Sequence, residues 1–261
     1  MKVAILYLGS LRDSKMHILD KINNLNKSFE SHEITNFVSI WKDEYYDENN
    51  KDFLNLLAEN YEKKNIKIII NDINRDNLKC LNRRNTPVPY YIFCQLKDSI
   101  LEINKIDNFD FLVKSRNDLE INLKFNLNEA NHKSNLVYIP PLYWYPKKFR
   151  YISNLFPKNA VNDHFFISSW SFANYITKIN SELLEDMNIK SWDSEQFMFK
   201  IINSFGKSEK IKRLDIFKYK LKESANFKKM PKLIRPFKFF INLIGDLDGW
   251  EASLSELKKK W

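Results

Sequence analysis

The stretch KVAILYLGSLRDSKMHILDKINNLNKSFESHEITNFVSIW, from Lys2 to Trp41, carries the pattern that decides the fold. It opens with a β-rich apolar run, Lys2 to Leu8, and continues with Lys15 to Phe29, where apolar residues recur every third or fourth position. That spacing predicts a helix with one apolar face. A second β-rich run, Glu33 to Trp41, follows. A strand, a helix and a strand in this order predict a βαβ unit with parallel strands.

The same alternation continues along the chain. Further helices are expected at residues 52–64, 91–105, 172–179 and 194–205, and further strands at 67–71, 109–114, 136–139 and 165–168. Three consecutive isoleucines, Ile68 to Ile70, predict a strand that is buried on both faces of the sheet. The fold class is therefore α/β, with a mostly parallel sheet flanked by helices.

The domain organisation follows from length and from a change in composition. A chain of 261 residues is near the upper end of what one hydrophobic core serves. We expect one domain over residues 1–226 and a basic, aromatic helical tail over 227–261. Two interpretations of the tail stay open: a helix packed on the domain, or a helix adsorbed to an anionic membrane surface. Pro236 interrupts the helical pattern in either case.

The composition narrows the class of protein. With 42 Lys and Arg against 33 Asp and Glu, the formal charge of +9 favours phosphates, nucleic acid or an anionic membrane as partners. Two cysteines are too few for a disulfide framework and fit a reducing cytoplasm. The apolar run Val3 to Leu8 is too short for a signal peptide core, and no segment reaches the ~18 apolar residues of a membrane span. We expect a cytoplasmic protein whose tail is a candidate for contact with the inner membrane face.

The segment FDFLVKSRNDLEI, from Phe109 to Ile121, is the first place to look for chemistry. Its strand ends in Arg116, and the acidic pair Asp118 and Glu120 follows. Ligands of open α/β sheets bind at the carboxyl ends of the strands. Carboxylates placed there can hold Mg²⁺ or Mn²⁺, which neutralises a diphosphate, and an arginine can do part of that work directly. The alternative is a turn that begins at Asp118 and a solvated Glu120.

Other strand ends and helix starts carry further candidates. The first strand ends at Gly9, which permits close backbone approach, and Arg12 is then available for a phosphate or a base. A turn glycine with a surface arginine is the alternative. Asp163 in VNDHFF and Glu195 in SWDSEQF are candidates for a catalytic base that deprotonates an acceptor hydroxyl. Helix capping is the alternative role at the second of these sites. The chain contains no G-x-G-x-x-G and no Gly-rich phosphate loop, which disfavours Rossmann dehydrogenases and P-loop enzymes.

In their order along the chain, these stretches resemble bacterial and viral polysaccharide-synthesis proteins with the nucleotide-diphospho-sugar transferase fold, the Rossmann-like GT-A fold. The shared motifs are G-x-L-R at Gly9–Arg12, aromatic-x-x-x-Trp at Phe37–Trp41, R-x-D at Arg116–Asp118, N-D-x-F at Asn162–Phe165, and an acid that opens a helix, Glu195. The resemblance extends from the first strand to the helix expected at 194–205. It implies a glycosyltransferase that moves a hexosyl or related sugar from a nucleotide sugar to a glycan acceptor in surface polysaccharide biosynthesis.

The resemblance also implies roles for individual residues. It places Gly9 and Arg12 near the nucleotide, Arg116 and Asp118 by the diphosphate, and Asp163 or Glu195 at the acceptor. This chain has R-N-D-L-E where a plain D-x-D is common, so three arrangements stay open. A divalent cation binds through Asp118 alone, through Asp118 and Glu120, or not at all. For a lipid-linked acceptor, the basic tail gives a reason to stay at the membrane.

Two rival functions remain. The charge of +9 and the cationic, aromatic run Tyr143 to Lys148 suggest a protein that binds single-stranded nucleic acid. Its basic residues are spread along the chain and no recognised nucleic-acid motif is present, so no nucleic acid is expected as a partner. The other rival is a transferase-like scaffold without activity.

Overall fold

The computed structural model describes residues 1–9, 11, 17–72, 88–117, 119–123, 125, 127, 136–140, 164–179, 194–206, 211–213 and 216–221. All of them belong to one compact unit, Met1–Pro141 with Asn159–Lys222. The aromatic run at 143–148 and the tail at 227–261 lie outside the described residues, so the boundary at residue 226 stays a prediction. No helix within the described ranges has the length and apolar character needed to cross a membrane.

The structure contains a helix or strand at each predicted range. In chain order they are β1 (Lys2–Leu8), α1 (Ile18–Ser28), β2 (Glu33–Trp41), α2 (Lys42–Tyr45), the 3-10 helix η2 (Glu48–Asn50), α3 (Lys51–Glu59), α4 (Tyr61–Lys64), β3 (Ile66–Asn71), α5 (Val88–Asn104), β4 (Phe111–Arg116), β5 (Leu119–Leu123), β6 (Val137–Ile139), β7 (Phe165–Ser169), α6 (Trp170–Lys178), α8 (Ser194–Gly206), β8 (Ile211–Arg213) and β9 (Ile216–Leu221). Of these, α2, η2, β5, β8 and β9 are additional to the predicted elements. The first two strands match their predicted bounds to the residue.

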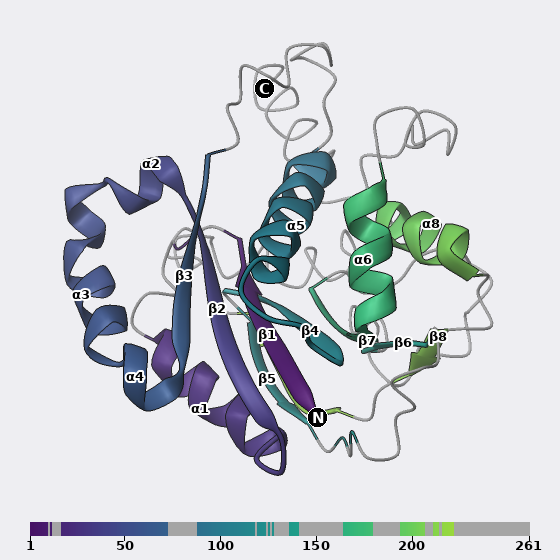
Figure 1. The fold of residues 1–261 in the computed structure, drawn as a ribbon, viewed down its shortest axis with the longest axis horizontal. Coiled ribbons are helices and arrows are strands. Elements are labelled where there is room, and N and C mark those ends of the chain that lie inside the picture. The colour runs from purple at the N-terminus through teal and green to yellow at the C-terminus, as the bar shows by residue number, and fades with distance from the viewer. Residues whose placement is uncertain are drawn as a thin grey trace, which may run out of the picture. The chain divides into compact units, whose positions relative to one another are not determined.

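The strands form a mixed but mostly parallel sheet (Figure 1). In the described part of the chain its order is β3-β2-β1-β4-β7-β6-β8, and β5 pairs with β9 in a separate ribbon. The strands β3, β2, β1 and β4 run parallel to their neighbours. Strand β7 runs antiparallel to both β4 and β6, and β6 and β8 are parallel. The predicted α/β fold with a mostly parallel, helix-flanked sheet is confirmed.

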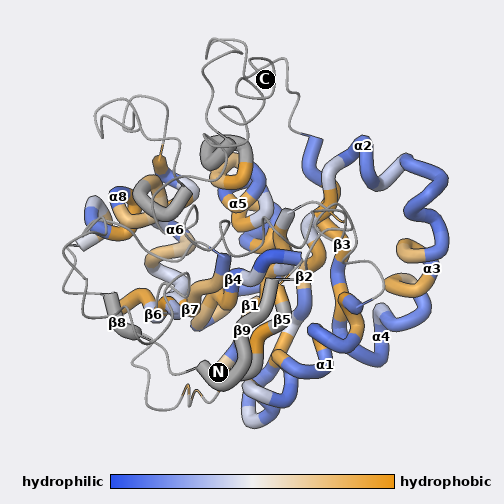
Figure 2. Tube along the Cα trace, turned by 180° about the vertical axis from the view of Figure 1, so that it is seen from behind, coloured by the Kyte–Doolittle hydropathy of each residue, from blue (hydrophilic) through white to orange (hydrophobic). Residues whose placement is uncertain are grey.

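Helices cover both faces of the sheet. Successive side chains of a strand point to opposite faces, so one strand can contribute to the packing on both. From β1, Ala4, Leu6 and Leu8 pack in one cluster with α5, α6 and α8. The intervening Val3, Ile5 and Tyr7 pack in a second cluster with α1, α3 and β5. Figure 2 shows the central strands as hydrophobic and the outer turns of α1 to α4 as hydrophilic. Fully burying one such apolar side chain contributes about 1.5–3 kcal/mol, so β1 anchors both cores.

The isoleucine-rich strand is less buried than its sequence predicts. β3 is the terminal strand of the sheet order, with β2 as its neighbour on one side. Of the three isoleucines, Ile69 is buried, Ile68 is partly buried and Ile70 is 41% exposed. The prediction that all three isoleucines are buried on both faces is therefore wrong, because an edge strand has neighbours on one side only.

The helix expected at 52–64 is two helices, α3 and α4. The break falls at Asn60, whose side-chain Nδ2 donates to the carbonyl of Leu56 at 2.9 Å. Asparagine side chains compete in this way with the backbone ladder and weaken a helix interior. α4 ends at Lys64, and the next residue, Asn65, has a left-handed φ of 44°. These residues turn the chain into β3.

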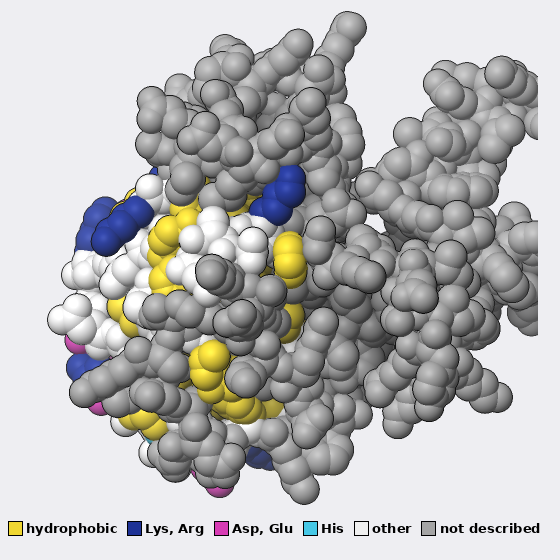
Figure 3. All heavy atoms as spheres, turned by 90° about the vertical axis from the view of Figure 1, so that its right-hand side faces the viewer, with side chains coloured by type: hydrophobic (Ala, Val, Ile, Leu, Met, Phe, Trp, Pro, Cys, Tyr) yellow, Lys and Arg dark blue, Asp and Glu magenta, His cyan; other side chains and the backbone are white. Residues whose placement is uncertain are grey.

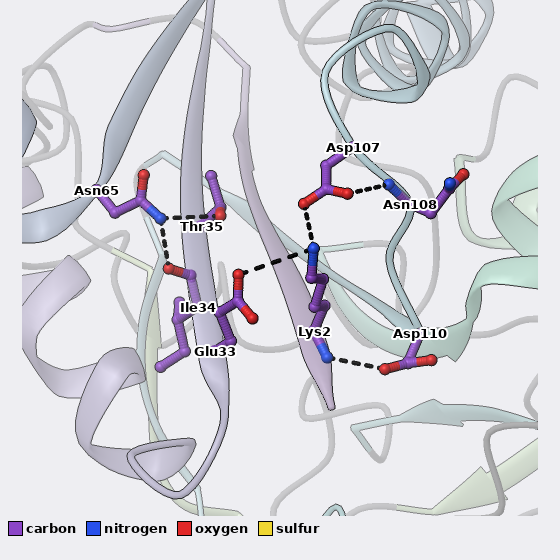
Figure 4. A network of polar contacts seen from close by, with 8 residues as sticks. All are labelled: Lys2, Glu33, Ile34, Thr35, Asn65, Asp107, Asn108 and Asp110. Carbon is purple, nitrogen blue, oxygen red and sulfur yellow. Dashed lines mark hydrogen bonds and ion pairs between the residues drawn. The ribbon is translucent and has the colours of Figure 1, made fainter.

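The amino ends of the strands are tied by a polar network (Figure 4). The main-chain N–H of Lys2 donates to Oδ2 of Asp110 at 2.8 Å, and its ammonium group donates to Oδ2 of Asp107 at 2.6 Å. Glu33 of β2 lies 3.9 Å from the same ammonium group. These contacts join β1 to β2 and to the segment before β4. They lie at the edge of the sheet opposite the strand ends that carry the candidate ligand-binding residues.

Candidate functional site

The strand order reverses between β1 and β4. From β1 the chain adds β2 and then β3 on one side, and it returns at β4 on the other side. In open α/β sheets the ligand binds outside the carboxyl ends of the strands at such a switch point. Here the carboxyl ends are Leu8 of β1 and Arg116 of β4, which pair in register. The candidate site is therefore the edge of the sheet that the carboxyl ends of β1 and β4 form.

Gly9 turns the chain out of the sheet directly after β1. Its φ is +110°, a conformation that side chains with a Cβ rarely adopt. A Cβ built at this position would meet no atom within 4 Å. The backbone conformation, and not a lack of space, therefore requires glycine here. Leu11 is the next described residue, and it is buried.

Asn117 fastens the end of β4 to this turn. Its main-chain N–H donates to the carbonyl of Leu8 at 2.9 Å, and its side-chain Nδ2 donates to the carbonyl of Gly9. Asn117 is only 4% exposed. Its Oδ1 atom is buried and has no hydrogen-bond partner among the described residues. The side chain of Asn117 thus adds a bond between the Gly9 turn and the end of β4, beyond the main-chain ladder.

Glu44 holds the same turn from the side of β2. Its Oε1 accepts a hydrogen bond of 3.1 Å from the main-chain N–H of Leu11. Its own carbonyl accepts from the side chain of Asn50 at 2.5 Å. Glu44 lies in α2, a helix that follows β2 directly and that the sequence pattern did not predict. The turn after β1 is therefore tied to both neighbouring strands.

On the other side of β4, the start of β7 reaches the same edge. The main-chain N–H of Arg116 donates to the carbonyl of His164 at 3.0 Å. His164 is buried and precedes β7, which runs antiparallel to β4. In the sequence, Asp163 directly precedes His164, and Asp118 follows Arg116 by two residues. Asp163 and Asp118 are therefore each close in sequence to a residue that is described at this edge.

The ends of β2 and β3 carry charge at the surface and polar groups beneath it. The ammonium group of Lys42 pairs with Asp72, and this hydrogen bond raises the pKa of Lys42. Below the pair, Ser39 Oγ accepts from Nδ2 of Asn71 at 2.6 Å and from Nε2 of Gln95 at 3.0 Å. Ser99 Oγ also lies 3.0 Å from Ser39 Oγ. This buried network joins α5 to the sheet near the candidate site.

The structure brings some of the predicted site residues together and leaves the others outside its description. Gly9 and Arg116 lie side by side at the ends of β1 and β4. The main chain of Glu120 lies in β5 opposite Lys220, and Glu195 is the second residue of α8. The side chains of these two residues, and all of Arg12, Asp118 and Asp163, lie outside the described part. The proposed catalytic and metal-binding roles therefore stay predictions.

Two residues of this edge had not been singled out from the sequence, Asn117 and Glu44. Asn117 stands between two candidates and directly follows a strand, so the argument from strand ends could have included it. Glu44 gives no such signal, because its partner is a main-chain N–H and not another motif residue. Within the described ranges, no three His, Cys, Asp or Glu side chains are grouped to hold a metal ion.

No protein-family model and no curated protein matches the chain. Among solved structures, similar ones include the galactosyltransferase LgtC in complex with donor and acceptor sugar analogues, at 13% identity and a TM-score of 0.48, covering 82% of this chain and 73% of that one. The apo form of the glycosyltransferase GlyE from Streptococcus pneumoniae TIGR4 is 12% identical, with a TM-score of 0.44 and coverage of 82% and 45%. A mutant Drosophila β-1,4-galactosyltransferase 7 with manganese, UDP-Gal and xylobiose is 13% identical, with a TM-score of 0.40 and coverage of 88% and 74%. Likenesses of this size carry no argument about what this chain does.

Proposed function

We propose that this chain is a glycosyltransferase that transfers a sugar from a nucleotide-sugar donor to a glycan acceptor. One observation carries the proposal. The Gly9 turn and the Arg116 strand end lie side by side at the switch point between β1 and β4, joined by Asn117. A turn that lets a ligand approach the backbone, next to a guanidinium group, suits the diphosphate of a nucleotide sugar.

The negative charge of a diphosphate suggests roles for the other residues predicted for the site. As the sugar leaves, negative charge grows on the diphosphate and must be neutralised. Arg116 and Arg12, which follows Gly9 by three residues, supply guanidinium groups. Asp118, alone or with Glu120, would hold Mn²⁺ or Mg²⁺, which prefer such oxygen ligands. A bound cation would supply electrostatic stabilisation of the leaving group.

A carboxylate near the acceptor would complete the reaction. In an inverting transfer, the base takes the proton of the acceptor hydroxyl, the oxygen attacks the anomeric carbon, and the bond to the diphosphate breaks. Asp163 is the first candidate, because its neighbour His164 is bonded to the main chain of Arg116. Glu195 is the second candidate. Phe197, two residues further along α8, packs edge-on against Phe93 of α5 at a centroid distance of 5.5 Å.

The acceptor that we propose is a growing surface polysaccharide, and a lipid-linked one would account for the basic tail. Lys and Arg side chains near an anionic leaflet contribute about 1 kcal/mol each. The protein would then work at the cytoplasmic face of the membrane. Removal of residues 228–244 should weaken its binding to vesicles that contain anionic lipid, without unfolding the domain.

The cationic, aromatic run that suggests the rival nucleic-acid function lies outside the described residues. Figure 3 shows the side on which α6 and α8 lie, where Lys and Arg side chains are scattered among hydrophobic ones. Partly buried aromatic side chains of these helices, Tyr175, Phe199 and Phe205, pack against the core. Binding of single strands uses a continuous basic groove with stacking platforms. The described part of this side has no such stripe.

A thermal-shift screen tests the proposal. The protein is mixed with UDP, GDP, CDP, CMP and their sugars, with and without Mn²⁺. A ligand that binds the native state stabilises it by about 2.7 kcal/mol at about 100 times its Kd. We expect one nucleotide class to raise the melting temperature, and Asp118→Asn to abolish the metal-dependent part of the shift. Asp72→Asn is the control, because Asp72 is an exposed carboxylate paired with Lys42 at the same edge.

The negative outcomes separate the rivals. If no nucleotide or nucleotide sugar raises the melting temperature, the transferase proposal fails and the scaffold remains. If, in addition, single-stranded nucleic acid binds at physiological salt with a steep dependence on salt concentration, the nucleic-acid function is supported. If Asp72→Asn removes the shift as fully as Asp118→Asn does, the metal role of Asp118 is wrong.

A further inference from the structure

We infer that Asn117 is a positioning residue of the donor site, which holds the Gly9 turn at a fixed place against the end of β4. The inference rests on the proposed function. Asn117 itself has no assigned contact with a ligand. It acts on the two segments that carry the predicted phosphate-binding groups.

The first argument is the pattern of hydrogen bonds. The parallel ladder of β1 and β4 ends at the pair Leu8 and Arg116. The main-chain N–H of Asn117 bonds to Leu8 O at 2.9 Å, and its side chain then adds a bond to the carbonyl of Gly9. The side chain thus extends the ladder at the point where the positive φ of Gly9 turns the chain away from the sheet. Among the described residues, the main-chain bonds to β4 reach only to Leu8.

The second argument is the burial of the amide. Asn117 is 4% exposed, and in the described part of the chain its buried Oδ1 has no hydrogen-bond partner. A buried polar atom without a partner destabilises the fold. The N–H group at the other end of the same amide makes the bond to Gly9. Aspartate at this position would place an acceptor against the acceptor oxygen of Gly9, so only a donor-bearing side chain of this length meets the requirement.

The third argument is the position of Asn117 in the sequence. It directly follows Arg116 and directly precedes Asp118, while the turn that it holds leads to Arg12. Among the described residues, the side chain of Asn117 therefore links the Gly9 turn to the end of β4. Misplacement of binding groups by about 1 Å can lower a rate by about a hundredfold. We therefore expect loss of the bond to Gly9 to lower the affinity for the donor nucleotide more than it lowers the stability of the fold.

The test compares Asn117→Asp with Asn36→Asp. Asn36 is a matched control, because it is also buried and its Nδ2 also donates to a carbonyl, that of Lys64, at 2.8 Å. It lies in β2 away from the strand ends. Binding of UDP, GDP and CDP with Mn²⁺ is measured by titration calorimetry, and unfolding by urea. Both variants should be less stable than the wild type, but only Asn117→Asp should lose nucleotide affinity, by about tenfold or more.

A second readout does not depend on a nucleotide. Hydrogen exchange of the peptide that covers residues 9–17 should be faster in Asn117→Asp than in the wild type or in Asn36→Asp, because the turn loses its attachment. Should Asn117→Asp fail to fold, Asn117→Ser takes its place, since its shorter side chain cannot reach Gly9 O.

The outcomes distinguish the inference from the function on which it rests. Equal nucleotide affinity of the wild type and the folded Asn117 variant overturns the role of Asn117 and leaves the transferase proposal intact. Absence of nucleotide binding by the wild type overturns the transferase proposal, and with it the donor role of Asn117. Unchanged hydrogen exchange at residues 9–17 overturns the attachment of the turn itself.

Discussion

The main-chain N–H of Leu11 donates a hydrogen bond of 3.1 Å to Oε1 of Glu44. Leu11 belongs to the turn that follows β1, and Glu44 belongs to α2, which begins directly after β2. Because the acceptor is a carboxylate, the bond is of the charge-assisted kind, which contributes about 1.5–3 kcal/mol. The candidate site therefore has a turn that is restrained by its neighbours before any ligand binds.

We expect Glu44→Ala to lower the free energy of unfolding by about 1.5–3 kcal/mol, because the N–H of Leu11 loses its acceptor. Glu44→Gln should retain most of the stability, since its amide oxygen still accepts the bond. Urea denaturation measures both. Glu48→Ala is the control, because Glu48 is exposed and its ion pair with Lys51 contributes little. Equal losses for the Ala and Gln variants of Glu44 would show that the bond to Leu11 does not stabilise the fold.

Gly9→Ala tests the conformation of the turn. The new Cβ would meet no atom within 4 Å, so the whole penalty comes from holding alanine at a φ of +110°. We expect a loss of about 1–3 kcal/mol in the free energy of unfolding. Gly206→Ala is the matched control, because Gly206 ends α8 and alanine is the better helix former there. An unchanged stability of Gly9→Ala would mean that the turn adopts another conformation in solution.

Ser39→Ala tests the buried network beneath the ends of β2 and β3. Ser39 Oγ is within hydrogen-bond distance of the side chains of Asn71, Gln95 and Ser99. Its removal leaves buried donors without their partner, at about 1–3 kcal/mol for each unpaired group. We expect a loss of about 2–4 kcal/mol in urea denaturation. Ser28→Ala, which removes one exposed bond to the carbonyl of Asn24, should change stability by less than about 0.5 kcal/mol. Similar losses for both variants would contradict the importance of the network.

The central strands were predictable because their signal is local. The apolar run at 2–8 is bounded by Gly9, and the run at 33–41 is equally continuous, so both strands match the structure. Local signals failed where a distant partner decides the structure. Residues 119–123 form β5 because they pair with β9 at 216–221, which no local pattern indicates. The exposure of Ile70 likewise follows from the place of β3 in the sheet and not from its composition.

The same distinction applies to the candidate site. That Gly9 and Arg116 are neighbours was predictable, because parallel strands bring their carboxyl ends to one edge of a sheet. The hydrogen bonds that fix this edge were not predictable. The partner of Asn117 is the carbonyl of Gly9, and the partner of Glu44 is the N–H of Leu11. Main-chain groups are the same in every residue, so the sequence does not indicate which of them a polar side chain meets.

The pair Lys2 and Asp107 should make stability depend on pH at the amino edge of the sheet. Their 2.6 Å hydrogen bond raises the pKa of Lys2 above 10.5 and lowers the pKa of Asp107 below 3.8. Because the pKa of Asp107 is lowered in the folded state, its stabilisation is present above the unfolded pKa and is lost as the pH falls through the folded pKa. Because the pKa of Lys2 is raised, its stabilisation is present below the unfolded value of 10.5 and is lost as the pH rises through the folded pKa. Asp107→Asn should therefore be less stable than the wild type between these limits, with a small difference because the pair is exposed, and the difference should vanish at about pH 2. Thermal unfolding at low salt measures this difference in stability. Glu102→Gln is the control, because Glu102 forms a similar exposed ion pair with Lys105. A difference that persists undiminished at that acidic pH would assign the effect of Asp107 to its shape and not to its charge.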